Sequence, residues 1–369
     1  MKNRTTKSTK GKTIKIVFIV FIILFIIGIV AYLFIRSYIN KMNLVKDSDE
    51  SKWTQAIPED IILDETAEES AISNIPNSAE EEIIIIEEEI RKNMEENSIP
   101  IMYSKNVFNI LLIGSDTREA GGTGRSDTMI IISINKKDKT ITVTSILRDI
   151  YLQINEKSYN RINAAFSYGG SELLLDAIKR NFKIEVDSYA SVDFFAFMDV
   201  IDAIGGIELE ITEEELPFIN RYVKNLNNLT DQSEEMHQIS EPGTYLLNGE
   251  QVLSYARIRY VGNGDFDRTA RQRKVLEQIF IKIKDMGILE INKLLNIVLP
   301  KVTTNLTEGE IFSLILSLPS LKSYEIEQWS IPMKGSYSFM RIRGMDVISI
   351  DFKKNIEELN RKIYGDLLQ

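Results

Sequence analysis

Arginines that could bind a polyanion are concentrated between Tyr255 and Arg273, in the segment YARIRYVGNGDFDRTARQR. Arg257 and Arg259 are two residues apart and therefore share a side of an extended chain. Arginines directed at one place repel each other unless a polyanion lies between them. Guanidinium groups bind phosphate oxygens bidentately and keep their proton, so this segment predicts a phosphate-binding site.

The second half of this segment has helical spacing. Arg268, Arg271 and Gln272 lie at i, i+3 and i+4, which places all three on one helix face. Arg273 is expected to point elsewhere and to pair at the surface. The alternative interpretation is a solvated charged helix, because the arginines flank acidic residues such as Asp265.

A second group of polar residues surrounds the glycine-rich segment Gly121–Gly124, between two predicted strands. Its members are Asp116 and Arg118 before the glycines and Arg125, Ser126 and Asp127 after them. Strand ends beside such a loop are common places for a site. An ordinary polar hairpin loop is the alternative.

Asp116 and Asp127 bracket these glycines and are candidate ligands for a magnesium ion. Mg²⁺ is a hard cation that accepts one or two carboxylates and fills its octahedron with water and substrate phosphate oxygens. The spacing makes such a site possible and does not by itself establish it.

Polar residues also follow the third predicted strand. Arg148 and Asp149 come directly after it, and Asn160–Asn163 is expected to open a helix. A helix N-terminus can bind an anion. Simple capping of this helix by Asn160 is the alternative.

The composition excludes several kinds of chemistry. The chain has no cysteine and one histidine, His237, so neither a thiolate nor a multi-histidine zinc site is expected. A Ser-His-Asp triad is disfavoured for the same reason. The net charge of -10 argues against nucleic-acid binding driven by bulk charge.

A long apolar run near the N-terminus predicts a membrane anchor. Val17–Ile35 is long enough for a membrane-spanning helix, and the basic flank before it places the N-terminus in the cytoplasm. The run ends in bulky residues, which argues against a cleaved signal peptide. The resulting division is a cytoplasmic tail (1–13), a transmembrane helix (14–36), an acidic extracytoplasmic stalk (37–104) and a catalytic domain (105–369).

Strand and helix patterns alternate after residue 105, which predicts an α/β fold with a mixed, α+β-like sheet covered by helices. The predicted strands are 107–113, 129–134, 140–147, 188–193, 207–211, 324–331 and 336–350. The predicted helices are 162–168, 170–182, 195–204, 247–256, 267–286, 289–298, 307–318 and 355–364.

Two further segments are expected at the surface. Residues 213–246 are polar and predict an irregular surface excursion. Between Pro76 and Pro100, isoleucines recur at helical spacing among glutamates, which favours a solvated amphipathic helix within the stalk.

The order of these motifs resembles the LytR–CpsA–Psr family of bacterial cell-wall glycopolymer ligases, over roughly residues 106 to 300. The matching stretches are NILLIGSDTRE, GRSDTMIIISIN, SILRDIYLQI, YNRINAAFSYGG, VDFFAFMDVIDAIGGIEL, LNGEQVLSYARIRY and DFDRTARQRKVL. The resemblance implies a phosphotransferase that moves a wall teichoic acid, capsule or related glycan from a polyprenyl-diphosphate carrier to a peptidoglycan hydroxyl. The partners would be that lipid-linked donor, peptidoglycan and the membrane, with no nucleic acid.

The resemblance also assigns roles to the candidate residues. Asp116 and Asp127 would hold Mg²⁺, or Mn²⁺ in its place, against the diphosphate, and Asp116 is the candidate base for the acceptor proton. The residues that would act on the donor are Arg125, Arg148, Arg257, Arg259, Asp265, Arg268, Arg271 and Gln272, among which Arg148, Arg257 and Arg259 are assigned to catalysis.

Two details of the resemblance concern packing. The polyprenyl tail requires an apolar tunnel, for which Phe166, Phe194, Phe195 and Phe197 are candidates, although such stripes usually form core. Leu147 stands where the family commonly has proline, and the glycines in Val261–Gly264 leave the placement of Asp265 open.

Two other functions remain alternatives. The same site could hydrolyse the lipid-linked diphosphate, with water replacing the sugar hydroxyl. The second alternative is a non-enzymatic envelope regulator of transcription. The outward orientation and the low isoelectric point weigh against it.

Overall fold

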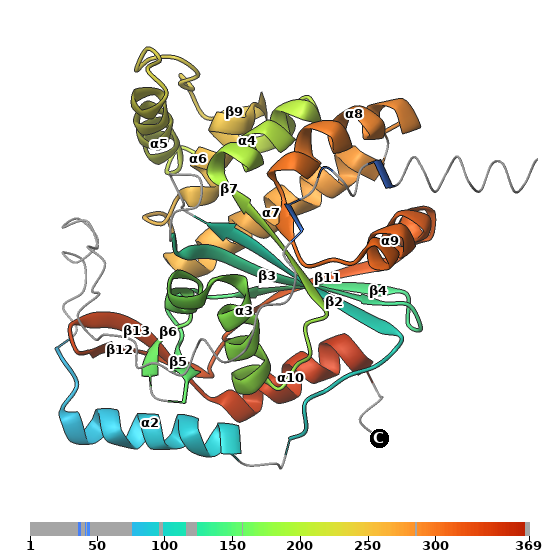
Figure 1. Cartoon of the computed structure of the whole chain (residues 1–369). Coiled ribbons are helices and arrows are strands. Elements are labelled where there is room, and N and C mark those ends of the chain that lie inside the picture. Colours follow the sequence, from blue (N-terminus) through green and yellow to red (C-terminus); the bar gives the residue numbers. More distant parts are fainter. Residues whose placement is uncertain are drawn as a thin grey trace, which may run out of the picture.

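The computed structural model describes residues 36–37, 41, 43–44, 76–95, 99–115, 124–156, 158–284 and 286–365 (Figure 1). No helix within these ranges has the length and hydropathy of a membrane span. Apart from Arg36, the predicted transmembrane segment lies outside them, as does most of the predicted stalk.

A mixed seven-stranded sheet forms the centre of the domain. Its strands lie in the order β1 (Asn43–Leu44), β10 (Thr303–Thr304), β7 (Ser188–Asp193), β2 (Val107–Ser115), β3 (Ser126–Asn135), β4 (Thr140–Ile146) and β11 (Glu325–Ile331). β2 runs parallel to β7 and antiparallel to β3, and β4 runs parallel to β11. The predicted mixed α/β fold is confirmed.

Three hairpin-like sheets and nine helices surround this sheet within the described ranges. The small sheets pair β5 (Tyr151–Asn155) with β6 (Ser158–Arg161), β8 (Ile207–Ile211) with β9 (Gly243–Leu247), and β12 (Tyr337–Ile342) with β13 (Met345–Ile350). The helices are α2 (Glu80–Glu95), α3 (Asn163–Phe182), α4 (Phe194–Ala203), α5 (Leu216–Leu229), α6 (Gly249–Arg257), α7 (Asp265–Lys284), α8 (Ile288–Val298), α9 (Glu308–Leu321) and α10 (Phe352–Tyr364).

Two large hydrophobic cores contain the buried faces of all the described helices except α9. The sheet core includes α3 and α10 next to the central sheet and α2 outside them, and it contains fully buried residues such as Leu111 and Phe182. The helical core lies among α4, α5, α6, α7 and α8, around residues such as Ile201 and Val252. The candidate site lies between these two cores.

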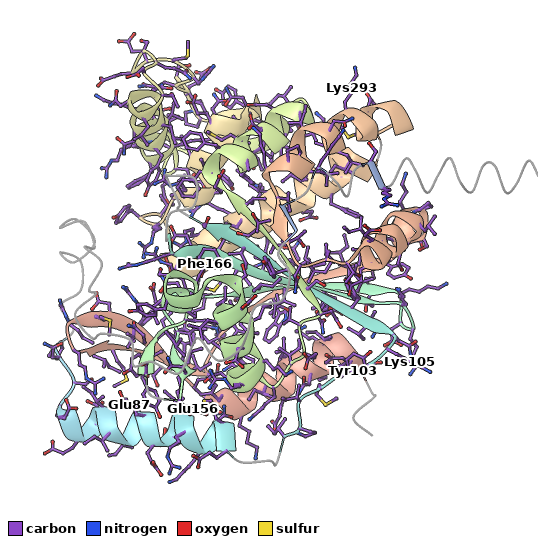
Figure 2. The ribbon with its side chains drawn as sticks, viewed as in Figure 1. Glu87, Tyr103, Lys105, Glu156, Phe166 and Lys293 are labelled. Atoms are coloured by element: carbon purple, nitrogen blue, oxygen red, sulfur yellow. The ribbon has the colours of Figure 1, made fainter. Side chains whose placement is uncertain are left out.

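Helix α2 belongs to the folded domain. Ile83 and Ile90 are 2% and 3% exposed and pack in the sheet core. Glu87, on the side of α2 that faces the domain in Figure 2, accepts a hydrogen bond of 2.6 Å from the Tyr151 hydroxyl. The prediction of a helix is confirmed, and the prediction of a solvated stalk helix is wrong, because two isoleucines a heptad apart fit the core.

The excursion at 213–246 is also more ordered than its polarity predicted. Helix α5 buries Ile219, Val223 and Leu226, the first two of them in the helical core, and β9 closes the excursion by pairing with β8. These three residues have i, i+4, i+7 spacing, which is typical of a helix. The prediction missed it because it relied on the polar composition of the whole segment.

The start of α3 also differs from the prediction. Asn160 and Arg161 belong to β6, and α3 begins at Asn163 without a side-chain cap. Gly169 and Gly170 leave the helical conformation inside α3, so the predicted break between 168 and 170 is confirmed.

Candidate active site

Arg148 joins three carboxylates that come from separate parts of the chain. It lies two residues beyond Ile146, the last residue of β4, and is 7% exposed. Its guanidinium forms an ion pair with Asp127, the second residue of β3. The Arg148 Nε lies 3.7 Å from Asp149 Oδ2 and 3.6 Å from Asp265 Oδ2. Arg148 therefore ties the start of β3 to the end of β4 and the start of α7.

Asp265 receives further arginines. Its Oδ1 accepts a 2.8 Å hydrogen bond from Arg259 Nε, and its Oδ2 accepts one of 3.0 Å from Arg268 Nη2. Arg259 also lies 3.9 Å from Asp149, and Arg161 lies 3.5 Å from the same carboxylate.

We call these seven residues the Arg/Asp cluster. They are Asp127, Arg148, Asp149, Arg161, Arg259, Asp265 and Arg268. Among the residues that the structure describes, four guanidinium groups share three carboxylates. Arginine keeps its proton at any physiological pH, so these four side chains stay positively charged.

Burial and charge act differently on the three aspartates. Burial alone raises the pKa of Asp127, but the charges of Arg148 and Arg268 outweigh it and hold that pKa below its ordinary value. Asp265 is also buried, and Arg268, Arg148 and Arg259 together hold its pKa far below the ordinary value. Burial raises the pKa of Asp149, and the neighbouring charge of Asp265 adds to the rise. Asp127 and Asp265 are therefore the firmly ionised members.

Arg257 lies beside the cluster in an aromatic clamp. Its guanidinium carbon is 4.9 Å from the centre of the Phe194 ring and 5.0 Å from that of Tyr222. Phe194 begins α4, and Tyr222 is on α5. Stacking on aromatic faces holds an arginine while leaving its edge able to donate hydrogen bonds. Tyr222 was missed from the sequence because it lies within the excursion.

Arg271 has a different environment from Arg268. It is 7% exposed and donates to Glu215 Oε1 at 2.8 Å, to the Ile258 carbonyl at 3.1 Å and to the Val261 carbonyl at 3.3 Å. Gln272 is buried beside it and donates to the Ala256 carbonyl at 3.4 Å. Both side chains hold the segment that carries Arg257 and Arg259, and the structure does not bring Arg271 into the Arg/Asp cluster.

The loop before α7 is fixed by short contacts. The Asp267 carboxylate accepts a 2.7 Å hydrogen bond from the Asn263 backbone. Gly262 has a φ of +74°, and a Cβ there would meet Asp267 Oδ2 at 1.8 Å. Glycine is therefore required at this position, and the loop delivers Asp265 to the cluster.

The remaining predicted residues flank the cluster. Burial raises the pKa of the Tyr168 phenol, and the charges of Arg125 and Arg161 oppose that rise, which places both arginines near Tyr168. Asn160 does not cap α3, since its Oδ1 accepts from the Arg161 backbone at 2.7 Å. The predicted surface pairing of Arg273 is wrong. Its Nη1 instead donates to the Ser145 hydroxyl of β4 at 2.8 Å.

The metal prediction is only partly within the described residues. Asp116 and Arg118 lie outside them, whereas Asp127 is described. In the described part of the chain, no three acidic or histidine side chains are grouped closely enough to hold a metal ion by themselves. A magnesium site here would thus depend on ligands from outside that set.

The four candidate tunnel residues do not share one core. Phe166, at the upper end of α3 in Figure 2, packs against the sheet core, and Phe197 packs against the helical core. Phe195 is 42% exposed. The α4 rings therefore lie on the side of the cluster occupied by Arg257.

Leu147 stands where the resemblance leads us to expect proline, and its backbone N–H makes a hydrogen bond. That group donates to the Ile331 carbonyl at 3.0 Å, and the side chain is fully buried. Proline lacks this donor. The contact joins β4 to β11 immediately before Arg148.

Curated relatives of the chain are named both as transferases and as regulators. The polyisoprenyl-teichoic acid–peptidoglycan teichoic acid transferase TagU of Enterococcus faecalis is 35% identical over 188 residues, which cover 50% of this chain and 56% of that protein. The regulatory protein MsrR of Staphylococcus aureus is 30% identical over 262 residues, covering 71% of this chain and 74% of that protein. The match to TagU thus spans just over half of that relative's length.

Solved structures share the fold. The protein YwtF (TagT), with bound octaprenyl pyrophosphate lipid, is 23% identical, with a TM-score of 0.53 over 73% of this chain and 94% of that one. The model of the LytR_cpsA_psr family matches residues 73–361, a range that includes α2 and the whole Arg/Asp cluster. The chain belongs to the LytR–CpsA–Psr family.

Proposed function

We propose that this protein is a membrane-anchored phosphotransferase that moves a glycopolymer from a polyprenyl-diphosphate carrier to a peptidoglycan hydroxyl. The glycopolymer would be a wall teichoic acid, a capsule or a related anionic glycan. The observation that carries the proposal is the Arg/Asp cluster, in which four arginines share three aspartates. A diphosphate diester brings negative charge and several phosphate oxygens, which guanidinium groups bind bidentately.

The reaction requires positioning and charge neutralisation rather than a protein nucleophile. The acceptor hydroxyl oxygen forms a bond to the phosphorus that carries the glycan. The bond from that phosphorus to the bridging oxygen breaks, and polyprenyl phosphate leaves with the electron pair. Arg148, Arg259 and Arg268 stabilise the charge on the phosphate oxygens. A carboxylate takes the hydroxyl proton, and Asp116 remains our candidate for it.

Mg²⁺, or Mn²⁺ in its place, is the proposed cofactor. It would neutralise the diphosphate as a Lewis acid. Asp127 suits one ligand position, because its side chain is 26% exposed and neighbouring arginines keep it ionised. Asp116 is the second proposed ligand, and substrate phosphate oxygens and water would complete the octahedron.

The anchor and the outward orientation belong to the same proposal. A single span at 14–36, with the N-terminus in the cytoplasm, would keep the domain at the outer surface of the membrane. The lipid-linked donor lies in that membrane and the peptidoglycan lies beyond it. The names of two similar proteins support the transferase part of the proposal, since one is called a teichoic acid transferase and another was solved with octaprenyl pyrophosphate.

The test is a transfer assay with the purified full chain in lipid nanodiscs. A polyprenyl-diphosphate glycan and peptidoglycan oligomers are supplied with Mg²⁺, and mass spectrometry detects the phosphodiester-linked product. We expect linked product from the native chain, none from Arg259→Ala, and a loss of activity in chelator. Release of free phosphorylated glycan alone, with acceptor present, would replace the transferase by the hydrolase.

A further inference from the structure

Three aromatic rings from two distant parts of the chain form a continuous row of contacts. Phe266 on α7 and Tyr337 on β12 have ring centres 4.8 Å apart, and Tyr337 and Phe339 have ring centres 5.6 Å apart, edge to face. We call Phe266, Tyr337 and Phe339 the aromatic platform. Neither the fold nor the phosphate chemistry described above accounts for its outer end.

The platform adjoins the Arg/Asp cluster at two points. Phe266 directly follows Asp265, the aspartate that receives Arg259 and Arg268. On the hairpin, Phe339 is paired across the strands with Ile348, and the Ile348 backbone N–H donates to the Asp149 carbonyl at 2.8 Å. The hairpin is therefore fastened to the residue next to Arg148, and its rings lie at the rim of the site.

The outer ring is open and has a polar border. Phe339 is 58% exposed, whereas Phe266 and Tyr337 are partly buried against the sheet core. Tyr337, Phe339 and Arg341 alternate along β12 and so share one face of the strand. Arg341 lies 3.8 Å from its cross-strand neighbour Asp346, so a charged pair continues the row beyond the rings.

A row of aromatic faces that ends in a charged pair suits a sugar. One face of a pyranose ring presents C–H groups, which are attracted to the negative face of an aromatic ring. Its hydroxyl groups lie at the edge, where charged side chains can accept or donate hydrogen bonds. A lipid chain has no polar groups that could hydrogen-bond with the Arg341–Asp346 pair. A protein partner would need a larger surface than one exposed ring.

We propose that the aromatic platform binds the acceptor glycan strand of peptidoglycan and presents its hydroxyl to the Arg/Asp cluster. This inference rests on the proposed function. In an in-line displacement, the acceptor and the leaving lipid phosphate lie on opposite sides of the phosphorus. The exposed Phe195 and the Arg257 clamp lie on the α4–α5 side, which suits the lipid. Figure 1 places the β12–β13 hairpin on the other side of the sheet from α4 and α5, which leaves it for the acceptor.

The test measures binding without any transfer. The full chain in nanodiscs is titrated calorimetrically with a peptide-free peptidoglycan tetrasaccharide, in the absence of lipid donor. We expect Phe339→Ala and Phe339→Leu to weaken binding about tenfold and Phe339→Tyr to bind as the native chain does, because only tyrosine keeps the ring. Leu316→Ala is the control, since Leu316 is 63% exposed on the distant helix α9.

Each outcome decides the proposal. Equal binding by the native chain and Phe339→Ala, or retained binding in Phe339→Leu, would overturn it, as would the absence of tetrasaccharide binding by the native chain. A loss of affinity for donor vesicles instead of the tetrasaccharide would assign the platform to the lipid side and also overturn it. If Phe339→Ala unfolds in circular dichroism, the comparison of Phe339→Leu with Phe339→Tyr carries the test. Because no transfer is needed, the proposed function can fail in its own assay while this result stands.

Discussion

Arg268 and Arg271 lie one turn apart on α7 and are both buried, yet they have different partners. Arg271 faces a single carboxylate, Glu215, and two backbone carbonyls that use its other nitrogens. Arg268 faces Asp265 within a cluster of four arginines and three aspartates. Its Nε is buried and makes no hydrogen bond within the described part of the chain.

The difference separates a structural arginine from a binding arginine. The charge of Arg271 is matched by Glu215, so an additional anion gains little there. The Arg/Asp cluster instead gathers four guanidinium groups at one place, where several of them can donate to the oxygens of one diphosphate. Residue type and helical spacing are the same in both places, and only the supply of carboxylates differs.

The largest effect is expected at Arg148. Arg148→Ala removes the guanidinium that joins Asp127, Asp149 and Asp265, and we expect transfer by the folded protein to fall about 10³-fold. Arg148→Lys keeps the charge but not the planar fork, so it should recover only part of the rate. Transfer rates in nanodiscs, with circular dichroism as the folding control, check this. Activity of Arg148→Ala within tenfold of the native chain would contradict a role in catalysis.

Arg271 should instead affect stability. Arg271→Ala leaves the Glu215 charge buried and uncompensated, which is expected to lower the free energy of unfolding by roughly 3–5 kcal/mol. The double variant Arg271→Met with Glu215→Leu should regain most of it, because both charges are then absent. Urea unfolding of the three proteins measures the difference. A change below about 1 kcal/mol in Arg271→Ala would show that the pair is not structural.

The aspartates should give pH dependences of opposite sign. Burial raises the pKa of Asp149 above its ordinary value of 3.8, so folding favours the protonated carboxyl. Asp149 therefore stabilises the folded state below pH 3.8, and this stabilisation is lost as the pH rises through the raised pKa of Asp149. Relative to the native chain, Asp149→Asn should therefore become more stable across that window, by at most about 1.4 kcal/mol per pH unit.

Asp265 provides the opposite case. Because its pKa is held below the ordinary value, its contribution is present above 3.8 and is lost as the pH falls through the lowered pKa. Asp265→Asn should therefore have a lower free energy of unfolding than the native chain near neutral pH, and the difference should disappear only in strong acid. Urea unfolding from strong acid to pH 7 compares both variants with the native chain. Parallel stability curves for all three proteins would disprove the assigned shifts.

The smallest effect is expected at the aromatic clamp. Tyr222→Leu removes one of the two rings on Arg257, and a cation–π contact at a partly exposed site contributes about 0.5–1 kcal/mol. We expect the KM for the lipid donor to rise about three- to fivefold with kcat little changed. Tyr222→Phe keeps the aromatic face and should restore the native KM. Steady-state kinetics of the two variants check this, and equal KM values for Leu and Phe would exclude the clamp.

Local sequence determined most of the regular elements. The segments 188–193 and 207–211 formed the expected strands, and the Gly169–Gly170 break in α3 was visible as two adjacent glycines. The spacing of Arg268 also placed it on the predicted helix. These features depend on backbone preferences and on the period of neighbouring side chains, which a single sequence contains.

The tertiary structure decided which charges meet. Asp127, Asp149 and Asp265 converge on Arg148 from three segments separated by up to 138 positions, and Arg271 received Glu215 from the excursion that was predicted to be irregular. The same holds for α2, whose isoleucines are buried only because β5, α3 and α10 provide a surface for them. An arginine's function depends on the balance of charge around it, and long-range packing sets that balance.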